Sequence, residues 1–217
     1  AELLALTENN PAEYNGTFAE VSTSAKRPGG FVMTGMTSKA LATAGTKTDV
    51  AVTLKRTVAK IAVQAATTAE FSKRYQGKVR VNSAVLSKGA SKGFLISQAT
   101  FSTGTMNFTH TQSANEAAGK YNNLFYALEN GTLTAGSRPM LTLNATYDRD
   151  GNFSTTSDQA NIIYSIELSG SGTGQFVRNG YYRVQANIDG LTGADASATI
   201  SVAEWETPVT QSVNLGQ

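Results

Sequence analysis

Residues Asp49–Gln64 read DVAVTLKRTVAKIAVQ, and this stretch contains two short runs in which apolar and polar residues alternate. The apolar residues of the first run are Val50, Val52 and Leu54, and those that dominate the second are Val58, Ile61 and Val63. A period of two predicts β-strands with one buried and one solvated face. The basic pair Lys55-Arg56 lies where the alternation breaks, so we expect a bend or a change of sheet there.

The overall composition bounds the class of protein. The chain has 217 residues, of which 40% are hydrophobic and only 16% are charged. A charged fraction this low is normal for a secreted β-rich protein, and the length suffices for one large domain or two small ones. The formal net charge is +2 and no basic patch stands out, so we expect no nucleic-acid partner.

Residue counts exclude several kinds of functional centre. The chain has no cysteine and a single histidine, His110. Iron–sulfur clusters, thiol catalysis, cysteine-based zinc sites and histidine-rich metal sites are therefore excluded, and we expect no cofactor. No apolar run approaches the ~20 residues needed to cross a bilayer. Because Ala1 does not begin a signal peptide, we expect a soluble chain or a processed part of a longer one.

The order of the periodic segments predicts the architecture. Short helices are expected in the N-terminal part, at residues 1–6 and 17–25. Most later segments read as strands between turn-forming clusters, at residues 79–86, 94–96, 124–128, 140–147, 162–168, 181–188 and 198–206. The polar segment 98–120 reads as an interdomain connection with a long surface loop. We therefore predict a mostly β fold of two β-sandwich domains, residues 1–97 and 98–217, with a boundary near Ser97.

Two groups of acidic residues each have a functional and a plain interpretation. Asp148–Asn152 (DRDGN) carries oxygen-bearing side chains at alternating spacing, as calcium loops do, but Gln159 stands where an EF-hand requires Glu. We favour a hairpin turn over a weak cation site there. Glu204 and Glu206 flank Trp205 and could form a glycosidase-like carboxylate pair. We favour a solvated strand face behind a buried tryptophan.

Two further motifs also lack the partners that chemistry would need. His110 lies in a polar stretch without an acidic residue to orient it, so we expect a surface histidine. Residues 170–174 (GSGTG) are followed by a strand-like run and have no adjacent lysine, which argues for a loop rather than a phosphate site. No catalytic, cofactor or metal constellation remains. The sequence therefore predicts a binding or structural protein, not an enzyme.

Four segments resemble the fimbrillins, the pilus (type V) subunits of Bacteroidales bacteria, and they occur in the order found in that family. They are residues 1–21 with GFVMTG at 30–35, the xRxxAKI strand at 55–61, LFYALEN at 124–130, and RNGYYRV at 178–184 with ISVAEW at 200–205. Together they span essentially the whole chain, and we identify a resemblance to this family.

The resemblance implies two transthyretin-like β-sandwich domains, with short helices in the N-terminal one. It also implies a lipoprotein precursor that reaches the outer membrane of a Gram-negative bacterium and is cut by an arginine-specific protease. In the family this cut removes the first strand and leaves a groove that a neighbouring subunit's strand fills, which builds a head-to-tail fimbria used in adhesion and virulence. Ala1 lies beyond the family's cleavage site, so the N-terminal domain is expected to lack its first strands.

The C-terminal segment is the candidate donor strand. After Pro208 the chain reads VTQSVNLGQ, in which one parity carries Val209, Gln211, Val213 and Leu215. Burial of the three apolar side chains in a neighbour's groove would contribute ~4–6 kcal/mol of transfer free energy. The alternative is a last strand paired within its own C-terminal domain. A shaft subunit and an accessory or tip subunit are both compatible with this segment.

An alternative function is a stand-alone surface module that binds glycans or proteins. Such a module needs an exposed aromatic platform, for which the candidates are Tyr121, Phe125, Tyr126, Tyr181 and Tyr182. We expect these residues in the core instead. The partners expected are other pilus subunits and a host or bacterial surface receptor, and contact with a membrane is expected only through lipidation of the precursor.

Overall fold

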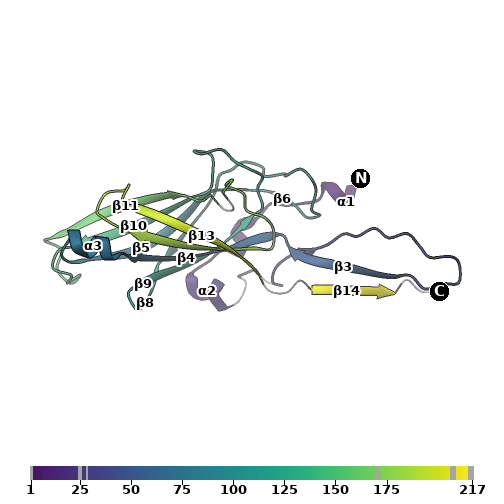
Figure 1. Cartoon of the computed structure of the whole chain (residues 1–217), viewed down its shortest axis with the longest axis horizontal. Coiled ribbons are helices and arrows are strands. Elements are labelled where there is room, and N and C mark those ends of the chain that lie inside the picture. Colours follow the sequence, from purple (N-terminus) through teal and green to yellow (C-terminus); the bar gives the residue numbers. More distant parts are fainter. Residues whose placement is uncertain (1, 24–25, 28, 170–171, 206–208, 215–217) are drawn as a thin grey trace.

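The structure is a computed structural model, and it describes residues 2–23, 26–27, 29–169, 172–205 and 209–214 (Figure 1). For Glu204 and residues 209–214 only the backbone is described. The helices are α1 (Glu2–Ala5), the 3-10 helix Pro11–Tyr14, α2 (Phe18–Thr23) and α3 (Ala69–Arg74). The predicted short helices near the start are therefore confirmed by α1 and α2.

Strands make up most of the regular structure, which confirms the mostly β prediction. In chain order they are β1 (Thr7–Glu8), β2 (Met33–Thr34), β3 (Asp49–Arg56), β4 (Val58–Thr67), β5 (Lys78–Gly89), β6 (Gly93–Phe94), β7 (Phe108–Ser113), β8 (Asn115–Ala117), β9 (Lys120–Leu128), β10 (Met140–Asp148), β11 (Gln159–Glu167), β12 (Gly180–Ile188), β13 (Ala196–Glu204) and β14 (Val209–Asn214).

Two sheets pack face to face as a β-sandwich. One has the order β11-β10-β5-β7 and the other the order β13-β12-β4-β9-β8. The strands are antiparallel except β4 and β12, which are parallel. Alternate residues of both sheets fill the layer between them; the largest fully buried ones include Ile61, Phe125, Leu86, Leu141, Leu143 and Tyr164. This alternation is the buried face that a period of two predicts.

The pairing of the strands corrects the predicted division at Ser97. The four-stranded sheet pairs β5, from before the boundary, with β7 and β10, from after it. The five-stranded sheet does the same with β4 between β9 and β12. A cut at residue 97 would thus separate strands that share hydrogen bonds. The predicted loop 98–120 also contains β7 and β8, whose polar residues hid their strand character.

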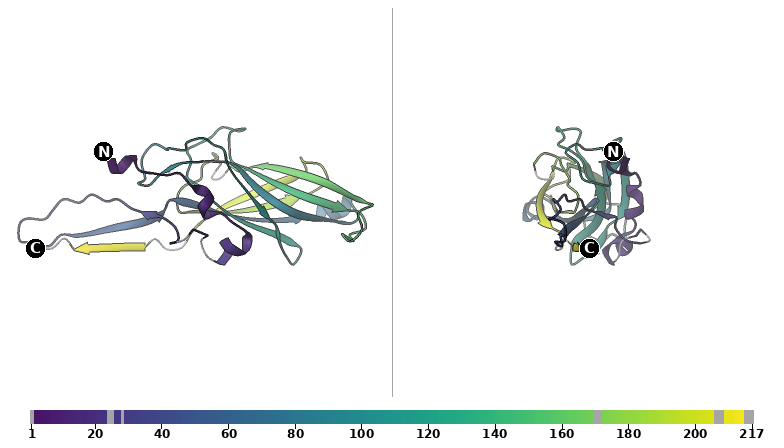
Figure 2. Two further views of the ribbon diagram at one scale, coloured as in Figure 1. Left: turned by 180° about the vertical axis from the view of Figure 1, so that it is seen from behind. Right: turned by 90° about the vertical axis from the view of Figure 1, so that its right-hand side faces the viewer.

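The change of sheet predicted at Lys55-Arg56 is confirmed. Residues up to Arg56 belong to β3, and those from Val58 belong to β4 in the sandwich. β3 pairs with β14 on one edge and with the short β2 on the other. These strands do not join either sheet of the sandwich. β3 and β14 form a two-stranded ribbon that projects from one end of the molecule (Figures 1 and 2).

The N-terminal segment covers the end of the sandwich from which the ribbon projects. α1 lies near this end, and α2 packs beside the five-stranded sheet (Figures 1 and 2). Tyr14 and Val21 are buried there against Leu124 and Leu128 of β9, in a second, smaller core. Among the described helices, none has the length and apolar character needed to cross a membrane.

Candidate functional site

The ribbon of β3 and β14 contains most of the candidate donor strand. The two strands are antiparallel and in continuous register from Val209 opposite Leu54 to Asn214 opposite Asp49. Gln211 lies opposite Val52, and Val213 opposite Val50. Leu215, the fourth residue of the candidate set, lies outside the described residues. The C-terminal segment is thus a strand, but its partner in this structure is β3 and not a strand of residues 98–205.

The ribbon is a single layer. Along β3 the residues alternate between exposed and half-buried, and the half-buried ones are Val50, Val52, Leu54 and Arg56. In the sandwich the equivalent positions of β4 are fully buried, because a second sheet covers them. An isolated two-stranded ribbon is marginally stable in water. The pairing of β14 with β3 is therefore a weakly supported part of the fold.

The segment between β2 and β3 follows the other edge of the ribbon. Gly35 passes so close to β3 that a Cβ there would overlap the carbonyl oxygen of Thr53. Further along, the Lys39 ammonium donates a hydrogen bond to the Asp49 carbonyl oxygen over 2.5 Å. Regular pairing on this edge is confined to Met33 and Thr34 of β2 at the base of the ribbon. Among the described residues, the distal part of β3 thus has regular strand pairing only with β14.

An aromatic cluster holds the base of the ribbon; we call Tyr14, Phe31, Arg56, Tyr126 and Trp205 the base cluster. The Arg56 guanidinium lies 4.5 Å from the centre of the Trp205 ring and donates to the Trp205 carbonyl oxygen over 3.2 Å. Trp205 stacks on Tyr126 with ring centres 5.5 Å apart, and its edge meets Phe31 at 5.0 Å. Cation–π pairs of this kind stabilise by roughly 0.5–2 kcal/mol. Arg56 ends β3 and Trp205 precedes β14, so this contact joins the two strands where they leave the sandwich.

A buried ion pair connects the sandwich to β2, the short strand at the base of the ribbon. Arg178 and Glu129 form it, with side chains only 6% and 9% exposed. The Arg178 Nε donates to Glu129 over 2.9 Å, and its Nη1 donates to the Leu95 carbonyl oxygen over 2.7 Å. Nη1 also reaches the Thr34 hydroxyl in β2 at 3.3 Å. One guanidinium thus holds together the end of β9, the segment after β6 and the strand that anchors β3.

A second ionic network fixes the N-terminal segment. The Arg27 guanidinium donates to the Glu8 carboxylate and to the Tyr14 hydroxyl, each over 2.6 Å. Burial raises the pKa of the Glu8 carboxyl, but hydrogen bonds from Arg27 and from the Asn10 amide outweigh it. The pKa of Glu8 therefore lies below its ordinary value of 4.5. Tyr14 belongs to the base cluster, so this network also supports the base of the ribbon.

Exposed hydrophobic side chains gather near the ribbon end of the molecule. Large ones in the first part of the chain are Leu3, Leu4, Leu6, Met36 and Leu41. The first three belong to α1 or follow it, and α1 lies at the end from which the ribbon projects (Figure 2). Met36 and Leu41 lie in the segment between β2 and β3. Exposed apolar side chains that cluster in this way mark protein–protein contact surfaces.

Four of the five aromatic residues considered as a binding platform are in the core, as expected. Tyr121, Phe125, Tyr126 and Tyr182 are all less than a tenth exposed. Tyr181 is the exception, because it lies on the outer face of the five-stranded sheet and is only half-buried. Trp205 is 5% exposed, which confirms its predicted burial. Glu206 lies outside the described residues, so the structure does not decide between the solvated strand face that we favour and the carboxylate pair.

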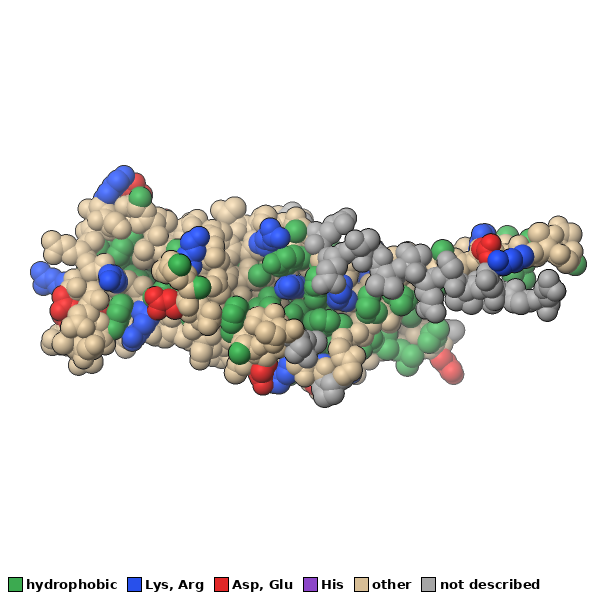
Figure 3. All heavy atoms as spheres, turned by 90° about the horizontal axis from the view of Figure 1, so that it is seen from below, with side chains coloured by type: hydrophobic (Ala, Val, Ile, Leu, Met, Phe, Trp, Pro, Cys, Tyr) green, Lys and Arg blue, Asp and Glu red, His purple; other side chains and the backbone are tan. Residues whose placement is uncertain are grey.

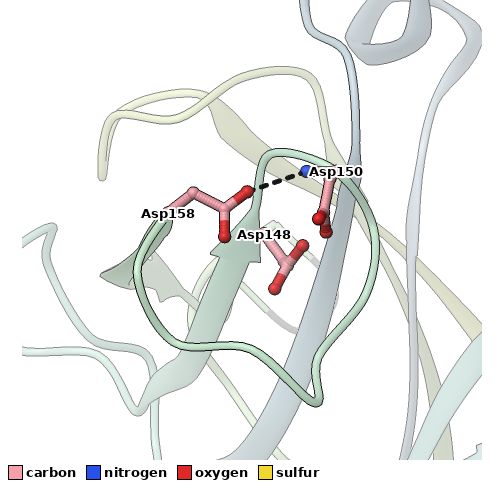
Figure 4. A group of neighbouring side chains, drawn as sticks. All are labelled: Asp148, Asp150 and Asp158. Carbon is pink, nitrogen blue, oxygen red and sulfur yellow. Dashed lines mark hydrogen bonds between the residues drawn. The ribbon is translucent and has the colours of Figure 1, made fainter.

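The acidic segment Asp148–Asn152 begins the loop between β10 and β11. Carboxylate oxygens of Asp148, Asp150 and Asp158 lie within 4.8 Å of one another (Figure 4). Burial raises the pKa of the Asp148 carboxyl, but hydrogen bonds from Gln159 and from backbone amides outweigh it and hold the pKa below its ordinary value. These oxygens are of the type that calcium prefers. The favoured turn is confirmed as a loop, and the weak cation site stays the untested alternative.

His110 is placed differently from the prediction of a loop residue. It lies on β7, half-buried, with Nε2 3.0 Å from the Gly16 carbonyl oxygen. Its ring meets the edge of Phe125 at 6.0 Å between ring centres. Its ring nitrogen therefore has a structural partner, which links β7 to the N-terminal segment.

The fold is shared with proteins of known structure. A Bacteroides eggerthii DSM 20697 protein provisionally described as a cell adhesion protein has a TM-score of 0.59 and 18% identity, over 94% of this chain and 70% of that one. A fimbrilin (fimA) from Porphyromonas gingivalis W83 has a TM-score of 0.53 and 16% identity, over 94% of this chain and 74% of that one. The resemblance to fimbrillins is thus matched at the level of the fold.

Other comparisons are weaker. A Parabacteroides distasonis ATCC 8503 protein, also provisionally described as a cell adhesion protein, has a TM-score of 0.46 and 16% identity, over 75% of this chain. The chain spans about half of that protein's length, at 53%. No protein-family model matches the sequence, and no curated protein matches it.

Proposed function

We propose that this chain is a subunit of a bacterial surface fimbria that supports adhesion and assembles by donor-strand exchange. The fold it shares with a fimbrilin and with an adhesion-type protein supports the fimbrial part of this proposal. The subunit would be exported as a lipoprotein precursor to the outer membrane and matured by an arginine-specific protease. Its partners would be further subunits, joined head to tail, and its role is not enzymatic.

The ribbon is the observation that carries the proposal. β14 pairs with β3 outside the sandwich, in a single layer that no second sheet covers among the described residues. A strand in this position can leave its partner without unfolding the sandwich. The base cluster keeps the start of the strand attached, so β14 stays tethered at Trp205 while its distal part reaches a neighbouring subunit.

The energetics favour exchange once a groove is available. The main-chain hydrogen bonds that β14 makes to β3 would be replaced one for one by bonds to the neighbour, so they contribute little net free energy. The side chains decide the balance, because a groove covers the face of the strand that carries Val209, Val213 and Leu215, whereas the ribbon is a single layer. Full burial of these three would contribute about 4–6 kcal/mol. Because donor and acceptor surfaces differ, the contact propagates instead of closing.

The test is assembly of the processed full-length protein with and without residues 209–217. We expect polymers, seen as SDS-resistant ladders and as fibres in electron micrographs, from the intact protein only. A matched pair of variants tests whether assembly depends on one particular face of the strand. Val213→Asp places a charge in the groove and should prevent assembly, whereas Ser212→Asp, on the opposite parity, should not. Polymers formed at the normal rate by the truncated protein would refute the proposal.

A further inference from the structure

A groove lies on the outer face of the five-stranded sheet, beside the base cluster. Its volume is about 500 Å³, and residues of β4, β9, β12, β13 and α2 line it. Phe18 and Ser22 of α2 form one wall. In Figure 3 basic side chains lie beside hydrophobic ones in the middle of the face seen from below. Among the described residues, its lining includes none of β3.

The groove is positively charged. Lys60 of β4 and Arg183 of β12 line it, and its lining contains no Asp or Glu among the described residues. In the part of the chain that the structure describes, neither cation pairs with a carboxylate within 4.0 Å. Basic side chains on a folded surface usually have acidic neighbours in a chain with nearly equal numbers of both. A carboxylate-free groove with two cations therefore favours an anionic ligand.

Tyr181 brings the two cations together. The Lys60 ammonium lies 4.8 Å from the centre of the Tyr181 ring, and the Arg183 guanidinium carbon lies 4.9 Å from it. The register pairs Tyr181 with Lys60 on neighbouring strands, and Arg183 follows two residues later on the same face. Because both positive groups lie within 5 Å of one ring centre, they lie within about 10 Å of each other. The ring thus holds two positive charges in the same part of the groove, where both attract an anion.

The rest of the groove combines apolar side chains, such as Ala62 and Leu124, with uncharged polar groups. Side-chain amides and hydroxyls line it at Gln64, Asn122, Gln185, Thr199 and Ser201. Amides both donate and accept hydrogen bonds, and hydroxyls do the same. Gln64 donates to Asn122 over 3.4 Å, which links two of these groups across neighbouring strands. This donor and acceptor mixture on a rigid sheet matches the hydroxyl groups of a sugar.

We propose that this groove binds an acidic saccharide, whose carboxylate lies at Lys60 and Arg183 and whose hydroxyl groups meet the amide and hydroxyl side chains. An acidic peptide is the other class of anion. A peptide that adds as a strand needs a free sheet edge. β4 and β12, which carry the two cations, are each paired on both sides, so the groove offers a sheet face at the cations and reaches the edge of the sheet only at β13. The saccharide is therefore the ligand that the geometry favours.

The test compares two saccharides that differ by one charged sugar. Binding of 3′-sialyllactose and of lactose to the monomeric protein is measured by titration calorimetry and NMR at low salt. We expect 3′-sialyllactose to bind at least tenfold more tightly than lactose. Arg183→Gln should weaken it about fivefold, the upper range for one exposed ion pair. The double variant Lys60→Gln/Arg183→Gln should lose the preference, and added salt should reduce it.

Controls decide how the result is interpreted. Lys73→Gln removes the same charge from α3, where the lysine is exposed, and should leave binding unchanged. Circular dichroism is used to check that each variant is folded. Equal binding of the two saccharides, no binding of either, or equal losses from Lys73→Gln and Arg183→Gln would overturn the proposal. Tighter binding of a tetraglutamate peptide than of 3′-sialyllactose would assign the groove to an acidic protein partner instead. Because the protein is monomeric in this experiment, its outcome is independent of assembly.

Discussion

Replacement of Arg178 by methionine should strongly destabilise the protein. The substitution keeps the volume of the side chain but leaves the Glu129 carboxylate buried without its partner, with only 9% of that side chain exposed. It also removes the donors to the carbonyl oxygens of Phe94 and Leu95. Removal of one partner from a buried ion pair costs about 3–5 kcal/mol. We therefore expect a loss of about 4 kcal/mol in the free energy of unfolding.

Urea denaturation followed by circular dichroism measures this loss. With an m-value of about 2–3 kcal/mol per M for a chain of this length, the unfolding midpoint should fall by roughly 1.5 M. The double variant Arg178→Met/Glu129→Met should recover most of the stability, because no buried charge remains. Lys73→Met breaks an exposed pair, with side chains 69% and 61% exposed, and should change the free energy by less than about 1 kcal/mol.

The outcome that refutes this reasoning is specific. If Arg178→Met costs no more than Lys73→Met, the pair does not carry the stability assigned to it. If the double variant is as unstable as the sum of the two single ones, the two side chains act independently. Loss of the Arg178 guanidinium should also loosen β2, because this group donates a hydrogen bond to the Thr34 hydroxyl. Hydrogen exchange in β2 and β3 should then accelerate more than in β10.

Three further predictions concern other parts of the structure. Glu8→Gln should lower stability at pH 7. Because the pKa of Glu8 is depressed in the folded protein, its contribution is present above pH 4.5 and is lost as pH falls through the folded pKa. The urea midpoints of variant and parent should therefore converge as pH falls below that pKa, and a constant difference between them at every pH would contradict the role of this network. Burial raises the pKa of Tyr164 to about 12, so its contribution to stability is present below pH 10 and is lost as pH rises through about 12. In an ultraviolet titration of the folded protein, Tyr164 should therefore ionise later than an exposed tyrosine. Loss of all phenol protons near pH 10 would contradict this prediction. Gly35→Ala should lower the melting temperature, because the added Cβ overlaps the Thr53 carbonyl. Gly93→Ala should change it little, because a Cβ there meets only ordinary contacts. Equal effects of the two variants would exclude the close approach of Gly35 to β3.

The local features of the fold could be predicted from the sequence. Alternation in residues 49–64 predicted both strands, and the break at Lys55-Arg56 predicted the change of sheet, because each strand carries its own pattern of buried faces. Trp205 was expected in the core because of its size and its strand context. These inferences depend only on neighbours along the chain.

The pairing of distant segments could not be predicted in this way. β4 pairs with β12, more than a hundred residues later, and no local pattern distinguishes that partner from any other strand with an apolar face. The boundary near Ser97 failed for the same reason. Arg56 was seen only as the end of a run, because its contact with Trp205 spans 149 residues. The one available signal was its place in the xRxxAKI segment.

The polar face of the five-stranded sheet was also missed. Lys60, Tyr181 and Arg183 lie on two strands that are far apart in sequence, so no local pattern brings the three residues together. Tyr181 was expected in the core with its neighbours, but alternation along β12 turns it outward while Tyr182 turns inward. A strict reading of parity would have separated the two tyrosines.

A disulfide lock on the ribbon tests the central claim most directly. The chain has no cysteine, so Val50→Cys and Val213→Cys introduce one possible bond between two residues that the register places opposite each other. Opposite residues of an antiparallel pair have the Cα separation that a disulfide requires. We predict that the oxidised double variant stays monomeric after proteolytic processing and forms fibres once reduced, while each single variant assembles normally. Fibre formation by the oxidised double variant at the rate of the reduced one would contradict the release of β14 from β3.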